Sequence, residues 1–191
     1  PAFTFIATAF APLAVGAVPV LVEVDETLTM DLRDAEKKIT PRTKAIIPVH
    51  MTGLVCDMDG VMALAKKHKL AVIEDACQCT GGTYRGKRVG SIGDAGCFSF
   101  NWYKILSCGE GGALVTNSAR VFERANVYSD PGSFCWGPAQ DAAGRYFAGQ
   151  NYRFNEILAA ILRVQLSRLD GWLETMRATR DEWLLALKGH P

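Results

Sequence analysis

Short apolar runs alternate with amphipathic segments of about ten residues through the first half of the chain. Strand-like runs lie at residues 20–24, 45–49 and 70–73, and helical patterns lie between them at 31–39 and 58–68. Helical crossovers of this kind join parallel strands, which are buried on both faces and therefore form nearly continuous apolar runs. We therefore expect an α/β fold with a mostly parallel central sheet and helices on both faces.

Local signals agree with this division. Asp31 and Asp57 stand where the two helices need N-caps, and alanine and leucine predict a further helix at 8–15. The glycines between Thr80 and Gly93 are spaced like those of hairpin turns. They do not form a GxGxxG pattern between a strand and a helix, so an NAD-binding βαβ unit fits poorly.

The second half of the chain adds two strand-like runs, at 95–100 and 113–116. A helix is predicted at 119–128. From Asn155 the pattern is helical almost to the end, with a break predicted at Gly171.

Composition narrows the class of protein. The chain has 191 residues with a net charge of +1, and its charged residues give no reason to expect nucleic acid as a partner. No apolar run approaches the roughly 20 residues of a membrane span, so we expect no membrane partner. The six cysteines lack the spacing of a zinc site, and we expect reduced thiols, no metal and a cytoplasmic protein.

Lys104 follows the run at 95–100 and precedes the glycine cluster at 109–112. A lysine in this setting can be a solvated loop residue beside a tight turn. It can also be a lysine that holds an aldehyde cofactor as a Schiff base, with Ser99 near the cofactor phosphate. This stretch leaves both interpretations open.

Asp75 favours the Schiff-base interpretation of Lys104. It comes just after the run at 70–73, at the carboxyl end of a predicted parallel strand, where such sheets bind ligands. Pyridoxal phosphate enzymes need a lysine for the aldehyde and a carboxylate against the pyridinium nitrogen. Taken singly, Asp75 is more often a turn or cap residue. Spacing does not decide between the two roles.

Ordered motifs carry a resemblance that does decide. The chain has EDACQ at 74–78, GSIGDAGCFSF at 90–100, Lys104, and GEGG at 109–112. This order closely resembles the sugar aminotransferases of the DegT/StrS family, which are fold-type I pyridoxal phosphate enzymes. Further segments similar to the family lie at 1–8, 41–50 and from 151–153 through 165–169, so the resemblance covers essentially the whole chain.

The resemblance implies roles for named residues. Lys104 corresponds to the Schiff-base lysine, and Asp75 corresponds to the carboxylate on the pyridinium nitrogen. Gln78 corresponds to a residue beside the cofactor ring, and Ser99 to a ligand of its phosphate. His50 is left outside the predicted site, as a residue either near the substrate or satisfied in a loop.

Two further residues follow from the same resemblance. Phe5 corresponds to the aromatic residue that stacks on the ring, with a plain core phenylalanine as the alternative. Asn151 corresponds to a residue that reaches the cofactor phosphate of a neighbouring subunit, with a turn asparagine as the alternative. The implied assembly is a homodimer with shared active sites.

The resemblance also implies a domain division. Residues 1–170 correspond to the cofactor-binding large domain, and 171–191 to the start of a helical linker towards a small C-terminal domain. The family's Gly-Thr-Ser phosphate-binding segment corresponds to a position before Pro1. We therefore expect these 191 residues alone to bind pyridoxal phosphate weakly or not at all.

The implied function is amino transfer from glutamate or glutamine to a keto-sugar, usually a nucleotide-linked one. The GEGG cluster and the Tyr103-Lys104 pair also resemble members that act on keto-inositols, aminoshikimate-type rings or octulosonates. One alternative is a sugar dehydratase of the same fold, but those enzymes have histidine at the position of Lys104. Another is a non-catalytic relative that serves as a regulator or binding subunit.

Overall fold

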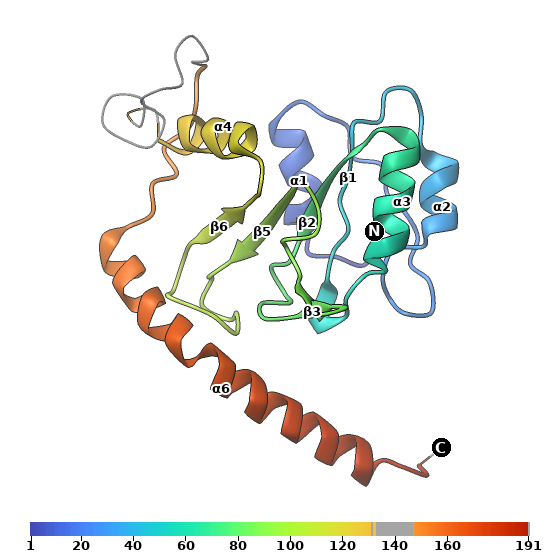
Figure 1. Cartoon of the computed structure of the whole chain (residues 1–191), viewed down its shortest axis with the longest axis vertical. Helices are drawn as coiled ribbons and strands as arrows, with labels where there is room; N and C mark the ends of the chain where they lie inside the picture. Colours follow the sequence, from blue (N-terminus) through green and yellow to red (C-terminus); the bar gives the residue numbers. More distant parts are fainter. Residues whose placement is uncertain (131, 133–146, 191) are drawn as a thin grey trace.

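A four-stranded mixed sheet forms the centre of the computed structural model, which describes residues 1–130, 132 and 147–190. Its strand order is β1-β2-β5-β6, and β1, β2 and β5 are parallel while β6 runs antiparallel to β5 (Figure 1). The predicted α/β fold with a mostly parallel sheet is confirmed. The strands are β1 (Ala45–Ile46), β2 (Ala71–Asp75), β5 (Ala95–Ser99) and β6 (Gly112–Val115).

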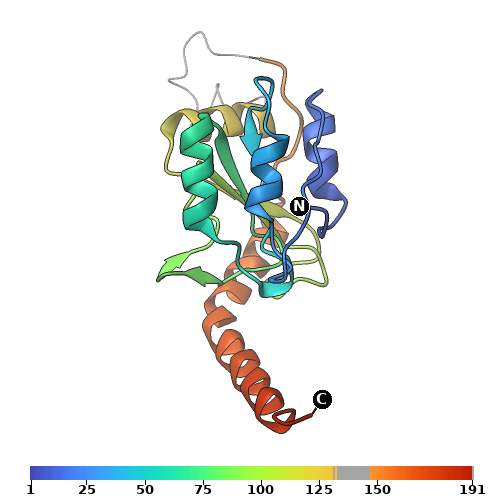
Figure 2. The ribbon, with the colours of Figure 1, turned by 90° about the vertical axis from the view of Figure 1, so that its right-hand side faces the viewer.

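Helices cover the sheet on two sides. α2 (Leu32–Lys38) and α3 (Met58–His68) lie side by side, and α3 contacts β1 and β2. α1 (Ala7–Ala14) lies on the other side of the sheet from α3 (Figure 2). Both predicted caps are confirmed: Asp31 accepts the amide hydrogens of α2, and Asp57 accepts that of Gly60 in α3.

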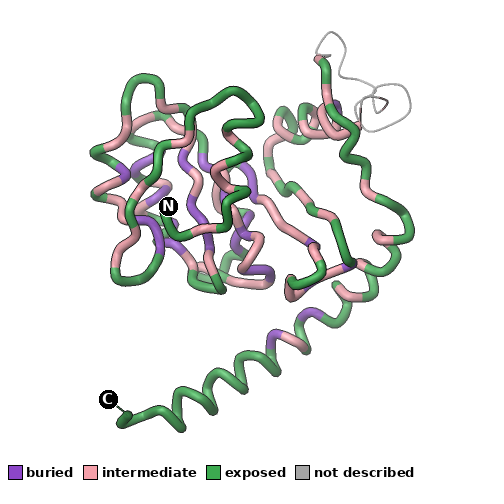
Figure 3. Tube along the Cα trace, turned by 180° about the vertical axis from the view of Figure 1, so that it is seen from behind, coloured by how far each residue is buried: buried purple, intermediate pink, exposed green. Residues whose placement is uncertain are grey.

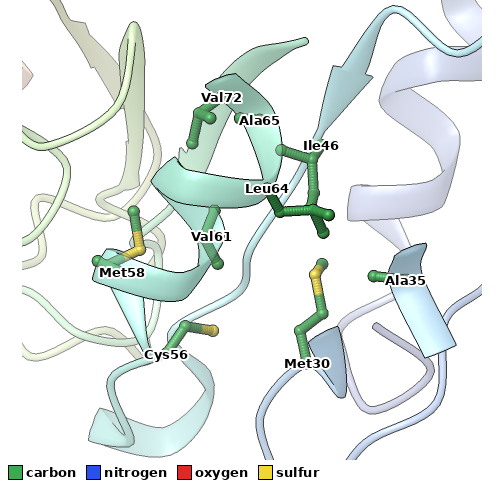
Figure 4. Close-up of a cluster of buried hydrophobic side chains, with 9 residues drawn as sticks. All are labelled: Met30, Ala35, Ile46, Cys56, Met58, Val61, Leu64, Ala65 and Val72. Carbon is green, nitrogen blue, oxygen red and sulfur yellow. The ribbon is translucent and has the colours of Figure 1, made fainter. Parts of the chain in front are cut away.

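The main hydrophobic core lies between α3, α2 and the first two strands (Figure 4). Met58 and Val61 of α3 are completely buried, and Val72 of β2 is almost completely buried against them. Burying one such side chain contributes about 1.5–3 kcal/mol to folding. This core fixes β2, and β2 in turn places the Glu74-Asp75 pair.

The predicted strand at 20–24 is wrong. Its only ladder contact among the described residues is an isolated bridge between Val24 and Met30. Val20 and Leu21 are exposed, so their apolar character reflects an uncovered surface and not a buried strand. The strand predicted at 45–49 is shorter than expected because Pro48 has no amide hydrogen to donate to the ladder, although its carbonyl accepts the Asp75 N–H.

The glycine-rich segment forms the predicted hairpin. β3 (Thr83–Tyr84) pairs with β4 (Lys87–Arg88), and the two residues between them, Arg85 and Gly86, both have positive φ angles. Such angles define the tight hairpin turn in which glycine is favoured. A short 3₁₀ turn, η1 (Met51–Gly53), connects the end of β1 to α3.

The last described element is a single helix. α4 (Ala119–Ser129) confirms the predicted helix at 119–128, and α6 (Glu156–Ala186) is the last helix among the described residues. The predicted break at Gly171 is wrong, since α6 runs through that residue. One glycine costs only about 1 kcal/mol in a helix interior, and Leu169 and Leu173 on either side are held in a buried cluster.

The second half of α6 extends away from the sheet, and most of its residues are exposed (Figures 1 and 3). The domain boundary predicted at 170/171 falls inside this helix and stays a prediction. Within the described ranges, no helix is both long and apolar enough to span a membrane.

Replacing Gly171 with alanine is expected to raise the free energy of unfolding by about 1 kcal/mol, because alanine restricts the unfolded chain and favours the helix. A methyl group at Gly171 would meet no neighbouring atom. Urea denaturation measures the change. Gly96→Ala is the contrasting variant, since its methyl group would overlap the Gly90 backbone, and a loss of stability in Gly171→Ala would contradict a continuous helix.

Candidate functional site

A small open pocket is lined by residues that follow the carboxyl ends of β2 and β5. Parallel sheets bind ligands at this edge. The pocket has a volume of about 170 Å³. Its walls come from two segments, one directly after β2 and one after β5, and its lining residues are Cys77, Gln78, Thr80, Tyr103, Lys104 and Ile105.

Asp75 is the last residue of β2 and stands at the entrance to the segment that lines this pocket. Its carboxylate accepts a hydrogen bond from the Thr8 hydroxyl at 2.7 Å and from the Cys77 N–H at 3.2 Å. Thr8 lies in α1, so this contact joins the helix on one side of the sheet to the strand end. A partly buried carboxylate fixed in this way is suited to bind a cationic ring nitrogen.

Lys104 enters the pocket from the turn after β5. Its N–H donates to the Asn101 carbonyl at 3.0 Å, which closes the turn. Its Nζ lies 4.7 Å from the ring centroid of Tyr103, within range of a cation–π contact. The side chain is partly buried and lines the open pocket.

Cys77 lies between the Asp75 carboxylate and the Lys104 amine in their electrostatic effects. Burial raises the pKa of the Cys77 thiol, the Asp75 carboxylate raises it further, and the Lys104 cation opposes the rise. Both charges therefore act on one thiol from close range. Because the thiol stays protonated, it does not compete with Lys104 as a nucleophile.

The structure brings some predicted site residues together and leaves others apart. Gln78 and Lys104 share the pocket, and Asp75 adjoins it through Cys77. Ser99 ends β5, where its Oγ accepts the Asn101 N–H at 3.4 Å, but it does not line the pocket. Phe5 precedes α1, and its side chain is half exposed.

Asn151 lies shortly before α6 and is exposed. The structure does not place it at the pocket of its own chain. Its predicted role in a neighbouring subunit stays a prediction.

Sequence reasoning missed five contributors to the site, which are Thr8, Cys77, Thr80, Tyr103 and Ile105. Thr8 is separated from Asp75 by 67 positions, so no local pattern reveals their hydrogen bond. Thr80 and Ile105 line the pocket without a chemical signature that would distinguish them from ordinary loop residues. Among the described residues, no three histidine, cysteine or acidic side chains gather in a way that could hold a metal ion.

A buried acid-base pair lies on the other face of the strand end. The side chains of His50 and Glu74 are completely buried, and His50 Nε2 lies 3.1 Å from Glu74 Oε2. The Cys56 N–H donates to His50 Nδ1, so the ring hydrogen is on Nε2 and points at the carboxylate. Three backbone N–H groups complete the shell of Glu74, those of Gly90, Ile92 and Gly93, each at 2.7 Å.

Burial alone would raise the pKa of Glu74, but hydrogen bonds from His50 and the three backbone amides lower it overall. A lowered folded-state pKa stabilises the fold above the unfolded value, which is 4.5. This contribution is lost as the pH falls below 4.5 and through the lower folded-state pKa. The buried pair therefore makes the fold sensitive to acid.

Glu74→Gln is expected to lower the free energy of unfolding at pH 7 by about 3–5 kcal/mol, because one member of a buried pair is removed. The difference from the unmodified chain should shrink as the pH falls below 4.5, where Glu74 loses its advantage. Urea denaturation at several pH values measures both effects. An exposed control, Glu26→Gln, should change little, and an equal loss at pH 3 and pH 7 would contradict the assignment.

The donor set fits pyridoxal phosphate. A lysine amine suits an aldehyde, and a fixed carboxylate suits a protonated ring nitrogen. The charges of Lys104 and Asp75 both act on Cys77, which lines the pocket. The Ser99 hydroxyl lies at the end of the neighbouring strand, outside the lining of the pocket, and its phosphate role stays a prediction. These residues come from separate elements that the sheet brings to one edge.

Comparison with known proteins identifies the family to which the chain belongs. The model of the DegT/DnrJ/EryC1/StrS aminotransferase family matches residues 1–189. The chain belongs to this family, and the resemblance of its ordered motifs is confirmed.

Individual relatives show the same relationship. GDP-perosamine synthase of Caulobacter vibrioides is 44% identical over 174 residues, which are 89% of this chain and 45% of that protein. L-glutamine:2-deoxy-scyllo-inosose aminotransferase of Streptoalloteichus tenebrarius is 40% identical over 178 residues, or 89% of this chain and 42% of that protein. The crystal structure of Streptomyces venezuelae DesV, in complex with a ketimine intermediate, superposes with a TM-score of 0.88 at 41% identity. That match covers all of this chain and 50% of DesV, so the chain spans about half the length of the relatives that it matches.

Proposed function

We propose that this chain supplies the cofactor-binding core of a pyridoxal phosphate-dependent sugar aminotransferase. The observation that carries the proposal is the meeting of Lys104 and Gln78 in one pocket, directly beside Asp75. Membership of an aminotransferase family supports the reaction class. The amino donor would be glutamate or glutamine, and the acceptor a keto-sugar or a related cyclic ketone.

Named residues would hold the cofactor. Lys104 would bind its aldehyde through Nζ, and the Asp75 carboxylate would bind the ring nitrogen and keep it protonated. Gln78 would lie beside the ring, while Ser99 would bind the phosphate and Phe5 would cover a ring face. When bound, pyridoxal phosphate supplies an electron-withdrawing ring that makes the C–H bond next to the amino group acidic.

The chain itself would supply orientation and proton transfer. The Thr8 hydroxyl and the Cys77 N–H each donate a hydrogen bond to the Asp75 carboxylate. These two bonds would hold the carboxylate in the orientation in which it binds the ring nitrogen. The Lys104 Nζ, once free, would act first as a general base that takes a proton from the carbon bearing the donor's amino group. It would then act as a general acid that gives the proton back as the amino group is transferred. Tyr103 would keep the amine at the pocket wall through its ring.

The acceptor belongs to one of two chemical groups. One relative is named for a GDP-linked amino sugar, and another for a cyclitol ketone with glutamine as the amino donor. Asn151 would serve the cofactor phosphate of a second subunit, which makes a homodimer the proposed assembly.

The direct test is amino transfer by a complete protein that carries this chain, with glutamate or glutamine as donor. A nucleotide-linked keto-sugar and a keto-cyclitol are offered in parallel, and the amino product is detected by mass spectrometry. We expect transfer to one of the two groups. Cofactor attachment without transfer to either acceptor would instead indicate a relative that binds the cofactor and lacks this activity.

A further inference from the structure

The buried pair of His50 and Glu74 lies immediately behind Asp75, yet neither side chain reaches the pocket. We propose that Glu74 and His50 are positioning residues that hold the Asp75 carboxylate at its place beside the pocket. The proposal rests on the function proposed above, since it gives Asp75 its role. It assigns a task to two buried groups that the chemistry of the pocket does not use.

His50 holds the Glu74-Asp75 segment at two points. Its side chain donates to the Glu74 carboxylate, with Nε2 and Oε2 3.1 Å apart. Its backbone N–H donates to the Asp75 carbonyl at 2.9 Å. Because adjacent residues of a strand point to opposite faces, one histidine fixes the backbone from which both acidic side chains leave.

Glu74 extends this hold to the loop that leads into the neighbouring strand β5. One carboxylate oxygen accepts the N–H groups of Ile92 and Gly93, and the other accepts that of Gly90. Gly90 passes directly over Gly96 of β5, where any side chain would overlap its backbone. Gly96, three residues before the end of β5, is also the register partner of Glu74. The carboxylate therefore holds the loop that leads into β5 against β2.

The Glu74 carboxylate therefore joins the segment after β1 and the loop before β5 to the end of β2. The segment after β1 carries His50, β2 ends at Asp75, and the loop before β5 supplies the three backbone N–H groups. Four N–H groups surround Glu74, two on each oxygen. A glutamine in its place would direct an NH₂ group at two N–H donors, so the clamp requires an ionised acid and not only a side chain of that size.

If Glu74 had only a structural role, its replacement would lower the stability of the fold without a specific effect on Asp75. The two roles differ in what happens to the amide hydrogens bonded to Asp75. The N–H of His50 binds its carbonyl, and the N–H of Cys77 binds its carboxylate. Their exchange with solvent reports the position of Asp75 directly and needs no cofactor.

The test compares amide exchange by NMR in the 191-residue chain and in two variants of reduced stability. Glu74→Gln removes the clamp, while Val61→Ala removes apolar contacts from the core on α3, where Val61 is completely buried. At matched global stability, we expect the His50 and Cys77 amides to exchange at least about tenfold faster in Glu74→Gln than in Val61→Ala, as expected for the loss of a hydrogen bond to a charged group. Equal exchange in the two variants would overturn the proposal.

A pair of histidine variants refines the test. The side-chain amide of His50→Gln can still donate to Glu74, so this variant should keep most of the protection at Cys77. His50→Leu cannot donate a hydrogen bond to Glu74, so it should lose the protection of the Cys77 amide. Equal protection at Cys77 in the two variants would also overturn the proposal.

Titration with pyridoxal phosphate in a complete protein that carries this chain separates this inference from the proposed function. If the unmodified protein and Val61→Ala bind, Glu74→Gln should bind at least about tenfold more weakly, and equal binding would contradict the positioning role. If the unmodified protein itself does not bind, the proposed function fails. The amide exchange of the chain still decides whether Glu74 positions Asp75.

Discussion

Replacing Lys104 with alanine is expected to abolish covalent attachment of pyridoxal phosphate and to lower amino transfer by at least about 10³-fold. The residue has two proposed tasks, holding the aldehyde and moving a proton, and alanine can perform neither. The pocket should survive the change, since Lys104 is partly buried, its backbone keeps the turn, and its side chain contacts the Tyr103 ring without a hydrogen bond among the described residues. Absorption of the bound cofactor and the transfer rate, measured in a complete protein that carries this chain, give the two readings.

A matched control for this variant is Lys87→Ala, which removes an exposed lysine in β4. It should leave both attachment and transfer unchanged. Lys104→Arg keeps the positive charge, but its guanidinium stays protonated and is not a substitute nucleophile, so it should behave like the alanine variant. Transfer by Lys104→Ala at a rate within tenfold of the unmodified protein would exclude Lys104 from both tasks.

Asp75→Asn is expected to lower amino transfer by about 10²–10³-fold, the usual cost of removing one well-placed electrostatic partner. Asparagine keeps the size of the side chain and an oxygen for the Cys77 N–H, while the Thr8 hydroxyl can rotate to accept from the new NH₂ group. The change therefore removes the negative charge and preserves the packing. The transfer rate and the midpoint of urea denaturation are measured on the same preparation.

The expected result is a large loss of rate with a change in stability below about 1 kcal/mol. Asp59→Asn is the control, because Asp59 is an exposed residue of α3 that pairs with Arg85. It should affect neither quantity. A parallel loss of rate and stability in Asp75→Asn would instead indicate that Asp75 supports the fold and not the ring nitrogen.

Local pattern predicted much of this fold because several elements carry their own signals. The helix at 58–68 has an N-cap aspartate and an apolar face, and the structure gives it those bounds. The hairpin turn at Arg85 and Gly86 is dictated by positive φ angles that glycine accepts readily. In such segments local preference and tertiary structure agree.

The errors have a common physical cause. Val20 and Leu21 are apolar, but no strand pairs with them among the described residues. Their hydrophobicity alone was therefore not enough to predict a strand. Gly171 is a weak helix residue, but the packing of Leu169 and Leu173 outweighs its local preference. In both cases the outcome depends on distant contacts and not on local composition.

The candidate site shows the same limit. Lys104 and Gln78 were predicted from ordered motifs, and the structure brings them to one pocket. The hydrogen bond from Thr8 to Asp75 and the contact between His50 and Glu74 join residues far apart in the sequence, and only the folded sheet places them together. The sequence left His50 outside the site, and the structure gives it a place behind Asp75 and not in the pocket.

The central claim is that Lys104 holds pyridoxal phosphate, and one measurement tests it most directly. The cofactor is added to a complete protein that carries this chain, its visible absorption is recorded before and after borohydride, and the digested protein is mapped by mass spectrometry. We expect a yellow band that borohydride removes, with the reduced cofactor fixed on the peptide that contains Lys104. A protein that shows no such band, or one whose label spreads over exposed lysines such as Lys87 and spares Lys104, would contradict the account.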